Sequence, residues 1–513
     1  MKNLKKLLCM LLASLTLLSS AAVFTGCGET ADDPNSQGTD AVTAASEAET
    51  VEVDDRFTNV DYNDREFRIY TSTNQASSSM SNSNFLIEGE GKMGGGLVSD
   101  AVFTRNIMVE DLLDVKLVFT QCDLGYGAIA GDIRKYTQSG DDEFDLVIND
   151  NYDYGTLVIE GHFRNLLEED CVFDFDRNYW YKDYMEDLRF IDDYQYLLAG
   201  DFFIDVLRTA HLLVLNKDMY YDYYRTSADE LYDVVSNYEW TYDKLITTIT
   251  GFYVDKNQNG IKDRDDQFGY MDTGYWGASI PLSTSGTTNF ITRDEDGVPS
   301  ITIHEGDRAN QLSSAITKLL NHEDTGLAID DNYIAYEDIM TNFIQGKTLV
   351  AAAMFMGSLE SQTLRQMESD AAVLPYPMLF ESDKKYTTAT HDTTELGAVL
   401  VTSKDMSFIS TVTEVLNRET ANILMPKYYK ECLQVQCVDD EKAAAMLDII
   451  HDNFNNSFIL TYNNALGSKI LQAFSTAAQE KREFSAVFAS SAKVINKNLN
   501  NKIRTFIKKN NIE

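Results

Sequence analysis

The twelve residues from Asp255 to Asp266 carry oxygen-bearing side chains at the spacing of a calcium-binding loop. Ca²⁺ takes about six to eight oxygen ligands, and a glycine at the sixth position permits the sharp turn between them. Gly260 occupies that position, and Ile261 is expected to contribute its backbone carbonyl oxygen. The predicted ligand set is Asp255, Asn257, Asn259, Ile261, Asp263 and Asp266.

Two departures from the ideal loop lower the expected affinity of this site. Its last position is Asp266 rather than the longer Glu, and Asn257 and Asn259 contribute no charge. The alternative is a turn whose Asn and Asp side chains bond to their own backbone and to water. If the loop binds calcium, we expect the ion to have a structural role rather than a sensory one.

Motifs of the common hydrolytic and nucleotide-dependent enzymes are absent from the sequence. It has no G-x-S-x-G elbow, no H-E-x-x-H motif and no phosphate-binding loop. Paired carboxylates, which glycoside hydrolases use, carry little information in a chain with 81 acidic residues. No enzyme is therefore predicted, and a secreted glycan-acting enzyme is kept as an alternative. The six histidines are scattered without metal-ligand spacing: His162, His211, His304, His322, His391 and His451.

Strand and helix patterns alternate along the sequence, which predicts an α/β fold. Residues 144–148 form an apolar run of the kind found in buried parallel strands, and Asn149 and Asp150 follow it. In open α/β sheets, ligands bind at that end of the strands. Further strands are predicted at residues 66–71, 115–119, 210–215, 349–355 and 371–374, and helices at residues 98–113, after a cap at Thr241, and over most of the chain from about residue 410.

The N-terminus has the pattern of an export signal. Three lysines precede an apolar run at residues 7–23, which is marginal for a membrane-spanning helix of about 20 residues. Small residues then precede Cys27, although Phe24 stands three positions before it, where Leu is usual. The segment resembles the lipobox of bacterial lipoproteins. That resemblance implies cleavage after residue 26, acylation of Cys27 and a location on the outer face of the cytoplasmic membrane; an uncleaved anchor helix is the alternative.

The composition after Cys27 bounds the possible partners. Residues 27–55 are small and polar, so we expect a disordered tether. The whole chain has a formal charge of −38, which opposes binding to nucleic acid and to anionic lipid headgroups.

Four cysteines remain beyond the anchor, with three possible pairings, and unpaired buried thiols are the alternative. They are Cys122, Cys171, Cys432 and Cys437.

Several short segments occur in an order that is more specific than any one of them. They are Asp100-Ala101-Val102 with Arg105-Asn106, residues 144–149, Leu215-Asn216-Lys217, Trp240-Thr241-Tyr242-Asp243, residues 255–269, Leu374-Pro375-Tyr376-Pro377, Tyr428-Tyr429 and residues 446–450. With them the chain resembles the extracellular solute-binding proteins (family 1, sugar-binding-protein-like) of bacterial ABC importers. The resemblance covers nearly all of the mature chain.

This resemblance implies a two-lobed, type II periplasmic-binding-protein-like fold with a hinge and extra C-terminal helices. Lobe 1 is expected at residues 56–160 and 383–430, and lobe 2 at residues 161–382 and 431–513. The lobes would close on a solute, expected to be a sugar or oligosaccharide, that ABC permease subunits then take. The protein is expected to act as a monomer. A binding-protein-like sensor or adhesion lipoprotein is a further alternative.

Sugar sites combine flat aromatic faces with a few fixed polar groups. Core packing is the alternative for any one aromatic side chain, and Trp240 is expected to be such a core residue. Trp276 is the preferred aromatic because Gly274 and Gly277 flank it in a predicted loop. By the family resemblance, Phe355 and Met356 face the cleft from the second lobe. The full set of predicted ligand contacts is Asn149, Asp150, Trp180, Tyr181, Asp201, Tyr275, Trp276, Phe355 and Met356.

Overall fold

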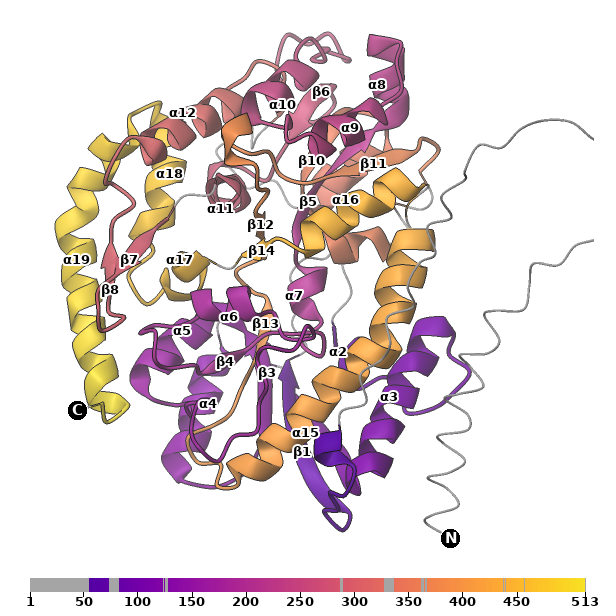
Figure 1. Ribbon diagram of the computed structural model, residues 1–513. Helices are drawn as coiled ribbons and strands as arrows, with labels where there is room; N and C mark the ends of the chain where they lie inside the picture. The colour runs from indigo at the N-terminus through magenta and orange to yellow at the C-terminus, as the bar shows by residue number, and fades with distance from the viewer. Residues whose placement is uncertain are drawn as a thin grey trace, which may run out of the picture.

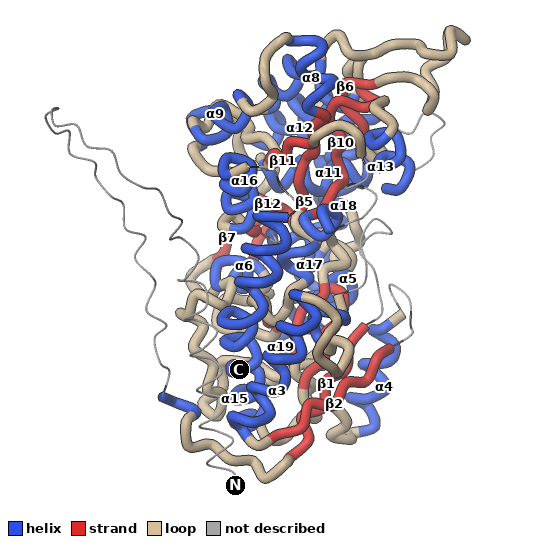
Figure 2. Tube along the Cα trace, turned by 90° about the vertical axis from the view of Figure 1, so that its right-hand side faces the viewer, coloured by secondary structure: helices blue, strands red, loops and turns tan. Residues whose placement is uncertain are grey.

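The computed structural model describes residues 55–72, 83–122, 124, 128–286, 289–326, 336–360, 364, 367–436, 438, 440–455 and 457–512. Two β-sheets lie toward opposite ends of an elongated body, with helices packed on them and between them (Figures 1 and 2). Each sheet is the centre of one lobe. The predicted two-lobed α/β fold is therefore confirmed.

The first lobe is built on a sheet with the strand order β2-β1-β3-β13-β4. β1 is parallel to β2 and β3, whereas β13 is antiparallel to β3 and β4. The strands are β1 (Arg65–Ser72), β2 (Val115–Cys122), β3 (Leu146–Asp150), β4 (Leu197–Leu198) and β13 (Glu395–Ala398). The helices that precede or pack on them are η2 (Asp55–Phe57), α2 (Asn84–Ile87), α3 (Leu97–Leu113), α4 (Ile129–Ser139), α5 (Asn151–Glu160), α6 (Lys182–Asp187) and α15 (Met406–Glu419).

The second lobe is built on a sheet with the strand order β11-β5-β10-β6-β9. β5 is antiparallel to β10 and β11, so this sheet is mixed like the first. Its strands are β5 (His211–Asn216), β6 (Phe268–Met271), β9 (Thr325–Gly326), β10 (Thr348–Phe355) and β11 (Ala371–Leu374), beside a hairpin of β7 (Ile291–Arg293) and β8 (Pro299–Ile301). Its helices are α8 (Lys217–Tyr224), α9 (Glu230–Ser236), α10 (Tyr242–Ile249), α11 (Tyr275–Ser285), α12 (Arg308–Leu320), α13 (Tyr336–Ile344), η3 (Met356–Glu360) and η4 (Glu381–Asp383).

Local sequence signals explain several of these elements. The apolar run before Asn149 becomes β3, in which all five residues are buried. The hydroxyl of Thr241 accepts a hydrogen bond from the Lys244 backbone at 3.4 Å and caps α10 as predicted. The neighbouring Trp240 is fully buried, and its indole N–H donates to the Pro375 carbonyl at 2.9 Å. Trp240 is thus the core residue that the sequence predicts.

The chain crosses between the lobes more than once. α7 (Asp205–Arg208) lies on the first crossing, between β4 and β5. A short parallel pair, β12 (Thr388–Ala389) and β14 (Phe454–Asn455), lies on later crossings. The predicted lobe boundary after residue 160 differs from the sheet membership, because β4 at residues 197–198 belongs to the first sheet.

Helices at the C-terminal end are shared between the lobes. Two π-helical segments, η5 (Thr420–Leu424) and η6 (Pro426–Gln436), continue α15 and lead to α16 (Glu441–His451). α17 (Ser457–Tyr462) packs on α5 of the first lobe, and α18 (Lys469–Glu480) packs on α11 and α12 of the second. Residues 431–513 were predicted to belong entirely to the second lobe, and the structure differs. α17 buries its apolar face against the first lobe, whereas α18 buries its apolar face against the second.

The final helix, α19 (Phe484–Lys509), contacts both lobes along its length (Figure 1). Near its start, the Ser485 backbone N–H donates to Asn310 Oδ1 in α12 at 2.9 Å. Near its end, the ring of Phe506 packs edge-on against that of Tyr196, with centroids 5.8 Å apart. α19 is a strap across the two lobes.

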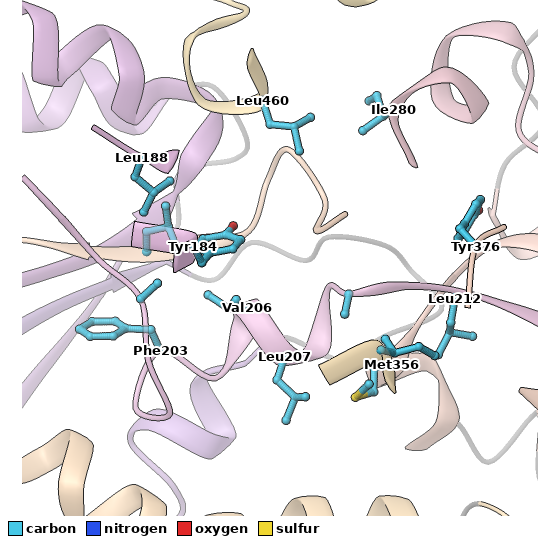
Figure 3. Close-up of a cluster of buried hydrophobic side chains, with 14 of the residues drawn as sticks. Tyr184, Leu188, Phe203, Val206, Leu207, Leu212, Ile280, Met356, Tyr376 and Leu460 are labelled. Carbon is cyan, nitrogen blue, oxygen red and sulfur yellow. The ribbon is translucent and has the colours of Figure 1, made fainter. Parts of the chain in front are cut away.

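The hydrophobic core is continuous through the lobe junction (Figure 3). Val206 and Leu207 of α7 lie between Phe203 on the first-lobe side and Leu212 and Met356 on the second-lobe side. All five side chains are almost completely buried. The junction is thus packed like the interior of either lobe.

The predicted signal, Cys27 and nearly all of the tether lie outside the described residues. In the part of the chain that is described, no helix combines the length and apolar character needed to span a bilayer. Cys122, Cys171 and Cys432 are thiols, and Cys437 is outside the described residues.

Candidate functional site

An ion pair joins the α7 crossing to the second lobe. Arg208 in α7 is fully buried, and its Nε lies 3.1 Å from Oε1 of Glu360, the last residue of η3. At the start of α7, an oxygen of Asp205 accepts the backbone N–H of Glu395 in β13 at 2.9 Å. The short helix is therefore bonded to the first sheet and to the second lobe at once.

Tyr428 completes this cluster from η6. Its hydroxyl donates to the same Glu360 oxygen that pairs with Arg208. Burial lowers the pKa of the Arg208 guanidinium, but the charges of Glu360, Tyr428 and Asp205 outweigh that effect, and the pKa is raised. Arg208 is thus a permanent buried cation held by acidic partners.

Phe85 presents an aromatic face beside this ion pair. The ring belongs to α2 of the first lobe and is 38% exposed. The guanidinium carbon of Arg208 lies 5.1 Å from its centroid, within cation–π range. Two positions earlier, the Ser83 hydroxyl donates to Glu395 Oε2 at 2.5 Å. An exposed aromatic face and fixed polar groups therefore lie side by side where the lobes meet.

Buried carboxylates surround the carboxyl end of β3. Asp150 lies opposite Glu395 in the antiparallel β3–β13 pair, and only 1% of it is exposed. Burial, followed by the charges of Asp153 and Asp392, raises the pKa of Asp150 to about 7. The region holds more carboxylates than cations, which disfavours an acidic ligand there.

Two histidines lie next to the predicted contact Phe355. The ring centroids of His211 and Phe355 are 4.7 Å apart, and those of His211 and His391 are 5.9 Å apart. Burial, and then the neighbouring His391, hold the pKa of His211 well below its usual value. His211 is therefore neutral and belongs to the apolar wall of the junction.

The predicted ligand contacts fall into separate groups. Asn149 and Asp150 lie at the end of β3, and Phe355 ends β10 where Met356 begins η3, so both pairs border the junction. All four are buried. The structure thus brings the two predicted pairs toward the same region. Because all four side chains are buried, other residues form the surface there.

Trp180 and Tyr181 have other surroundings. The Trp180 indole N–H donates to Glu414 at 2.9 Å, and its ring packs in an aromatic cluster with Phe173 and Phe203. With 3% of its surface exposed, Trp180 offers no open face to a sugar in this arrangement. The Tyr181 hydroxyl donates to Asp201 at 2.9 Å, so these two predicted contacts do lie together.

The remaining predicted contacts lie at the start of α11. The Tyr275 hydroxyl donates to Asn321 at 3.0 Å, at the end of α12. The side chain of Trp276 lies outside what the structure describes. Gly274 is the N-cap of α11, so the segment that follows it is helical where a loop was predicted.

The residues that sequence reasoning missed are Phe85, Arg208, Glu360 and Tyr428. Phe85 begins a short apolar run with Leu86 and Ile87, which is typical of a core segment, and Arg208 is brought to Glu360 only by the tertiary fold. Glu360 could have been found, because it follows Met356 by four positions on the segment that the family resemblance had already selected.

The predicted calcium loop is folded around its own carboxylates. Asp263 accepts the side-chain amides of Asn257 and Asn259, at 3.2 and 2.7 Å. Asp266 is fully buried and accepts the backbone N–H groups of Lys256 and Asp263 at 3.1 and 3.0 Å. Among the described residues, no group of three or more His, Cys, Asp or Glu side chains is arranged to hold a metal ion.

Structural comparison places the fold among known proteins, although no protein-family model and no curated protein matches the sequence. An ABC substrate-binding protein from Listeria monocytogenes, in complex with cycloalternan, matches with a TM-score of 0.52 and 12% identity over 85% of this chain and 99% of its own. The fold is that of ABC solute-binding proteins.

Two further solved structures agree. A solute-binding protein of an ABC transporter from Thermotoga lettingae, bound with α-D-tagatose, has a TM-score of 0.51 and 13% identity over 85% of this chain and 100% of its own. A cyclo/maltodextrin-binding protein complexed with maltotetraose has a TM-score of 0.56 and 10% identity over 84% of this chain and 96% of its own. These structural neighbours are binding proteins rather than enzymes.

Proposed function

We propose that this protein is a lipid-anchored, extracellular solute-binding protein that captures a carbohydrate and delivers it to an ABC importer. The observation that carries the proposal is a solute-binding-protein fold over most of the chain, with groups from both lobes meeting at one junction. Each of the three compared proteins is bound to a saccharide. The predicted signal and Cys27 support the export and anchoring parts of the proposal.

The junction supplies the groups that a sugar needs. Phe85 offers a ring face for the C–H side of a pyranose, and Glu360 offers carboxylate oxygens for its hydroxyls. Both hydrogen bonds made to Glu360 go to Oε1, so within the described residues Oε2 is the acceptor left for a hydroxyl. Arg208 holds this carboxylate in place through the contact between its Nε and Oε1.

Solute capture would work by a shift of population between open and closed lobes. A solute that contacts Phe85 on the first lobe and Glu360 on the second binds the closed form better than the open one. Only this difference in affinity moves the equilibrium. The closed arrangement of the two lobes would then be the form that the permease subunits receive.

A thermal-shift screen of the mature chain against neutral mono- and oligosaccharides tests the proposal. A saccharide that binds only the native state raises the melting temperature with concentration. For a saccharide that does so, calorimetry should show at least tenfold weaker binding to Phe85→Ala, with a melting temperature close to that of the parent. Glu360→Gln should also bind at least tenfold more weakly, measured below its own lowered melting temperature, because the change removes the carboxylate that compensates the buried Arg208 cation. The exposed Tyr221 of α8 provides a control, because Tyr221→Ala should bind with unchanged affinity. Absence of any shift across the panel would contradict carbohydrate binding.

We also propose that the loop from Asp255 to Asp266 binds a structural calcium ion. The ligand spacing supports this, as does Gly260, whose φ of +72° allows the turn. Asp255 Oδ1 is a buried atom with no hydrogen-bond partner among the described residues, so it can accept an ion. Asn257 and Asn259 would have to rotate their amides so that oxygen faces the ion.

Melting temperatures in calcium and in chelator test this site. Calcium should raise the melting temperature of the parent chain, and Asp255→Asn should abolish that rise. Asp243→Asn, at an exposed position on α10, should keep it. Equal melting in calcium and chelator for the parent would end the proposal.

A further inference from the structure

The charge on the last helix is opposite to that of the rest of the molecule. The chain contains 81 acidic and 43 basic residues, yet residues 484–512 contain six Lys or Arg and no Asp or Glu. α19 occupies residues 484–509 of this stretch and lies on the outer surface of the body (Figure 1). A basic surface has thus been built onto a strongly acidic protein.

Four of these cations form one stripe along α19. Lys493, Lys497, Arg504 and Lys508 follow one another at intervals of four, seven and four residues, which at 3.6 residues per turn keeps them within an arc of about 60°. All four are exposed, and within the described residues none of them forms an ion pair. The opposite face carries the buried apolar residues, Ile495, Leu499 and Phe506 among them.

A surface hollow lies at the C-terminal end of this stripe. It has a volume of about 420 Å³ and is lined by Arg504, Ile507, Lys508, Asn511 and Ile512. Ile507 is 37% exposed, and Val494 farther up the helix is 50% exposed. Cationic side chains therefore alternate with apolar side chains that are exposed to solvent. That combination fits the boundary of an anionic bilayer, where headgroups meet acyl chains.

We propose that the basic stripe of α19 docks on the anionic surface of the membrane and sets the orientation of the body on it. The proposal rests on the anchoring part of the proposed function, because the predicted lipid on Cys27 keeps the body near the bilayer. The tether predicted from the sequence at residues 27–55 would span about 30 Å if it behaves as a random coil. The body would thus stay close to a surface that complements the charge of the stripe.

The net negative charge of the protein does not prevent such contact. At physiological salt, charges act over about 8–10 Å, whereas α19 with about 1.5 Å per residue is close to 40 Å long. The headgroups beneath the helix therefore respond to the stripe, while the acidic remainder is repelled. Attraction on one face and repulsion elsewhere fix a single orientation.

Vesicle sedimentation tests the proposal on the mature chain carrying Cys27→Ser, so that no acyl group contributes. We expect binding to vesicles of phosphatidylcholine with 30% phosphatidylglycerol at low salt, and at least tenfold weaker binding to pure phosphatidylcholine. Charge reversal of Lys493, Lys497, Arg504 and Lys508 to Glu should reduce binding to the anionic vesicles at least tenfold. All four positions are exposed, so the melting temperature should stay close to that of the parent.

A matched variant separates the stripe from total charge. Lys116→Glu, Lys244→Glu, Lys384→Glu and Lys404→Glu together change the net charge by the same amount at exposed positions elsewhere. This variant should retain most of the vesicle binding. An equal loss in both variants would overturn the proposal, and so would binding to a soluble teichoic-acid polymer without binding to vesicles. Neither result depends on solute binding, which the saccharide screen tests separately.

Discussion

Arg208 and Glu360 form a buried ion pair that joins the α7 crossing to the second lobe, with 3.1 Å between Nε and Oε1. No part of the Arg208 side chain is exposed. In such a pair the cost of removing one partner exceeds the net benefit of having the pair, because the other charge is then left buried and uncompensated.

Removal of the Arg208 cation should therefore destabilise the protein strongly. We expect Arg208→Met to lower the free energy of unfolding by about 3–5 kcal/mol. The double variant Arg208→Met with Glu360→Gln should recover part of the loss. Urea denaturation gives both values.

An exposed ion pair provides the comparison. Lys318 and Asp243 lie 2.7 Å apart but are 58% and 84% exposed. Lys318→Met should change the free energy of unfolding by less than about 1 kcal/mol, because solvent screens such pairs. Equal effects at Arg208 and Lys318 would contradict the structural role assigned to the buried pair.

The two ends of α19 should lose protection from amide hydrogen exchange independently, because each end packs on a different lobe. Phe506 packs against Phe190 and Tyr196 of the first lobe, with ring centroids 5.1 and 5.8 Å apart. Phe506→Ala should speed amide hydrogen exchange in residues 500–512 while leaving residues 484–490 protected. Phe488→Ala, whose ring stacks on His304 at 4.9 Å, should do the reverse. Uniform exchange along α19 in both variants would show that the helix does not act as a strap with two separate ends.

Local patterns predicted much of the fold. The strand at residues 371–374 coincides with β11, and the helix expected at residues 98–113 is α3 with one further residue. These segments are determined by their own periodicity and caps. The membership of β4 in the first sheet was not predictable in the same way, because a two-residue strand carries no period and depends on partners about 200 residues away.

The site was harder to predict than the fold for a physical reason. An aromatic residue in the sequence can serve a binding face or the core, and only its packing decides between them. Trp180 and Phe85 show both outcomes: the first is enclosed at 3% exposure, and the second stays open at 38%. Arg208 has no local motif at all, and its partner Glu360 lies 152 residues away.

The role of Trp180 in the core can be tested separately from ligand binding. Its indole N–H and the hydroxyl of Tyr179 both donate to Glu414, which is fully buried. Trp180→Phe keeps an aromatic ring but leaves the carboxylate with one donor fewer. We expect a loss of about 1–3 kcal/mol in the free energy of unfolding. Saccharide affinity should not change, and a tenfold loss of affinity with unchanged stability would instead restore Trp180 as a ligand contact.

Asp150 should make the stability of the protein depend on pH. Burial and the charges of Asp153 and Asp392 raise its pKa from 3.8 to about 7 in the folded state. The folded form therefore binds the proton more tightly than the unfolded form. The stabilisation that results is complete below the unfolded pKa near 4 and is lost as the pH rises through 7. At pH 8 the ionised carboxylate is buried at a cost of up to about 4 kcal/mol.

Asp150→Asn should remove this dependence, because an amide is neutral at every pH. The variant should be more stable than the parent at pH 8 by about 2–4 kcal/mol and should lose most of that advantage at pH 4. Asp218→Asn, at an exposed position on α8, makes the same chemical change and should show no such difference between the two pH values. Denaturation midpoints at pH 4 and pH 8 decide the matter. A parent and an Asp150→Asn variant whose stabilities run in parallel across this range would show that folding does not raise the pKa of Asp150.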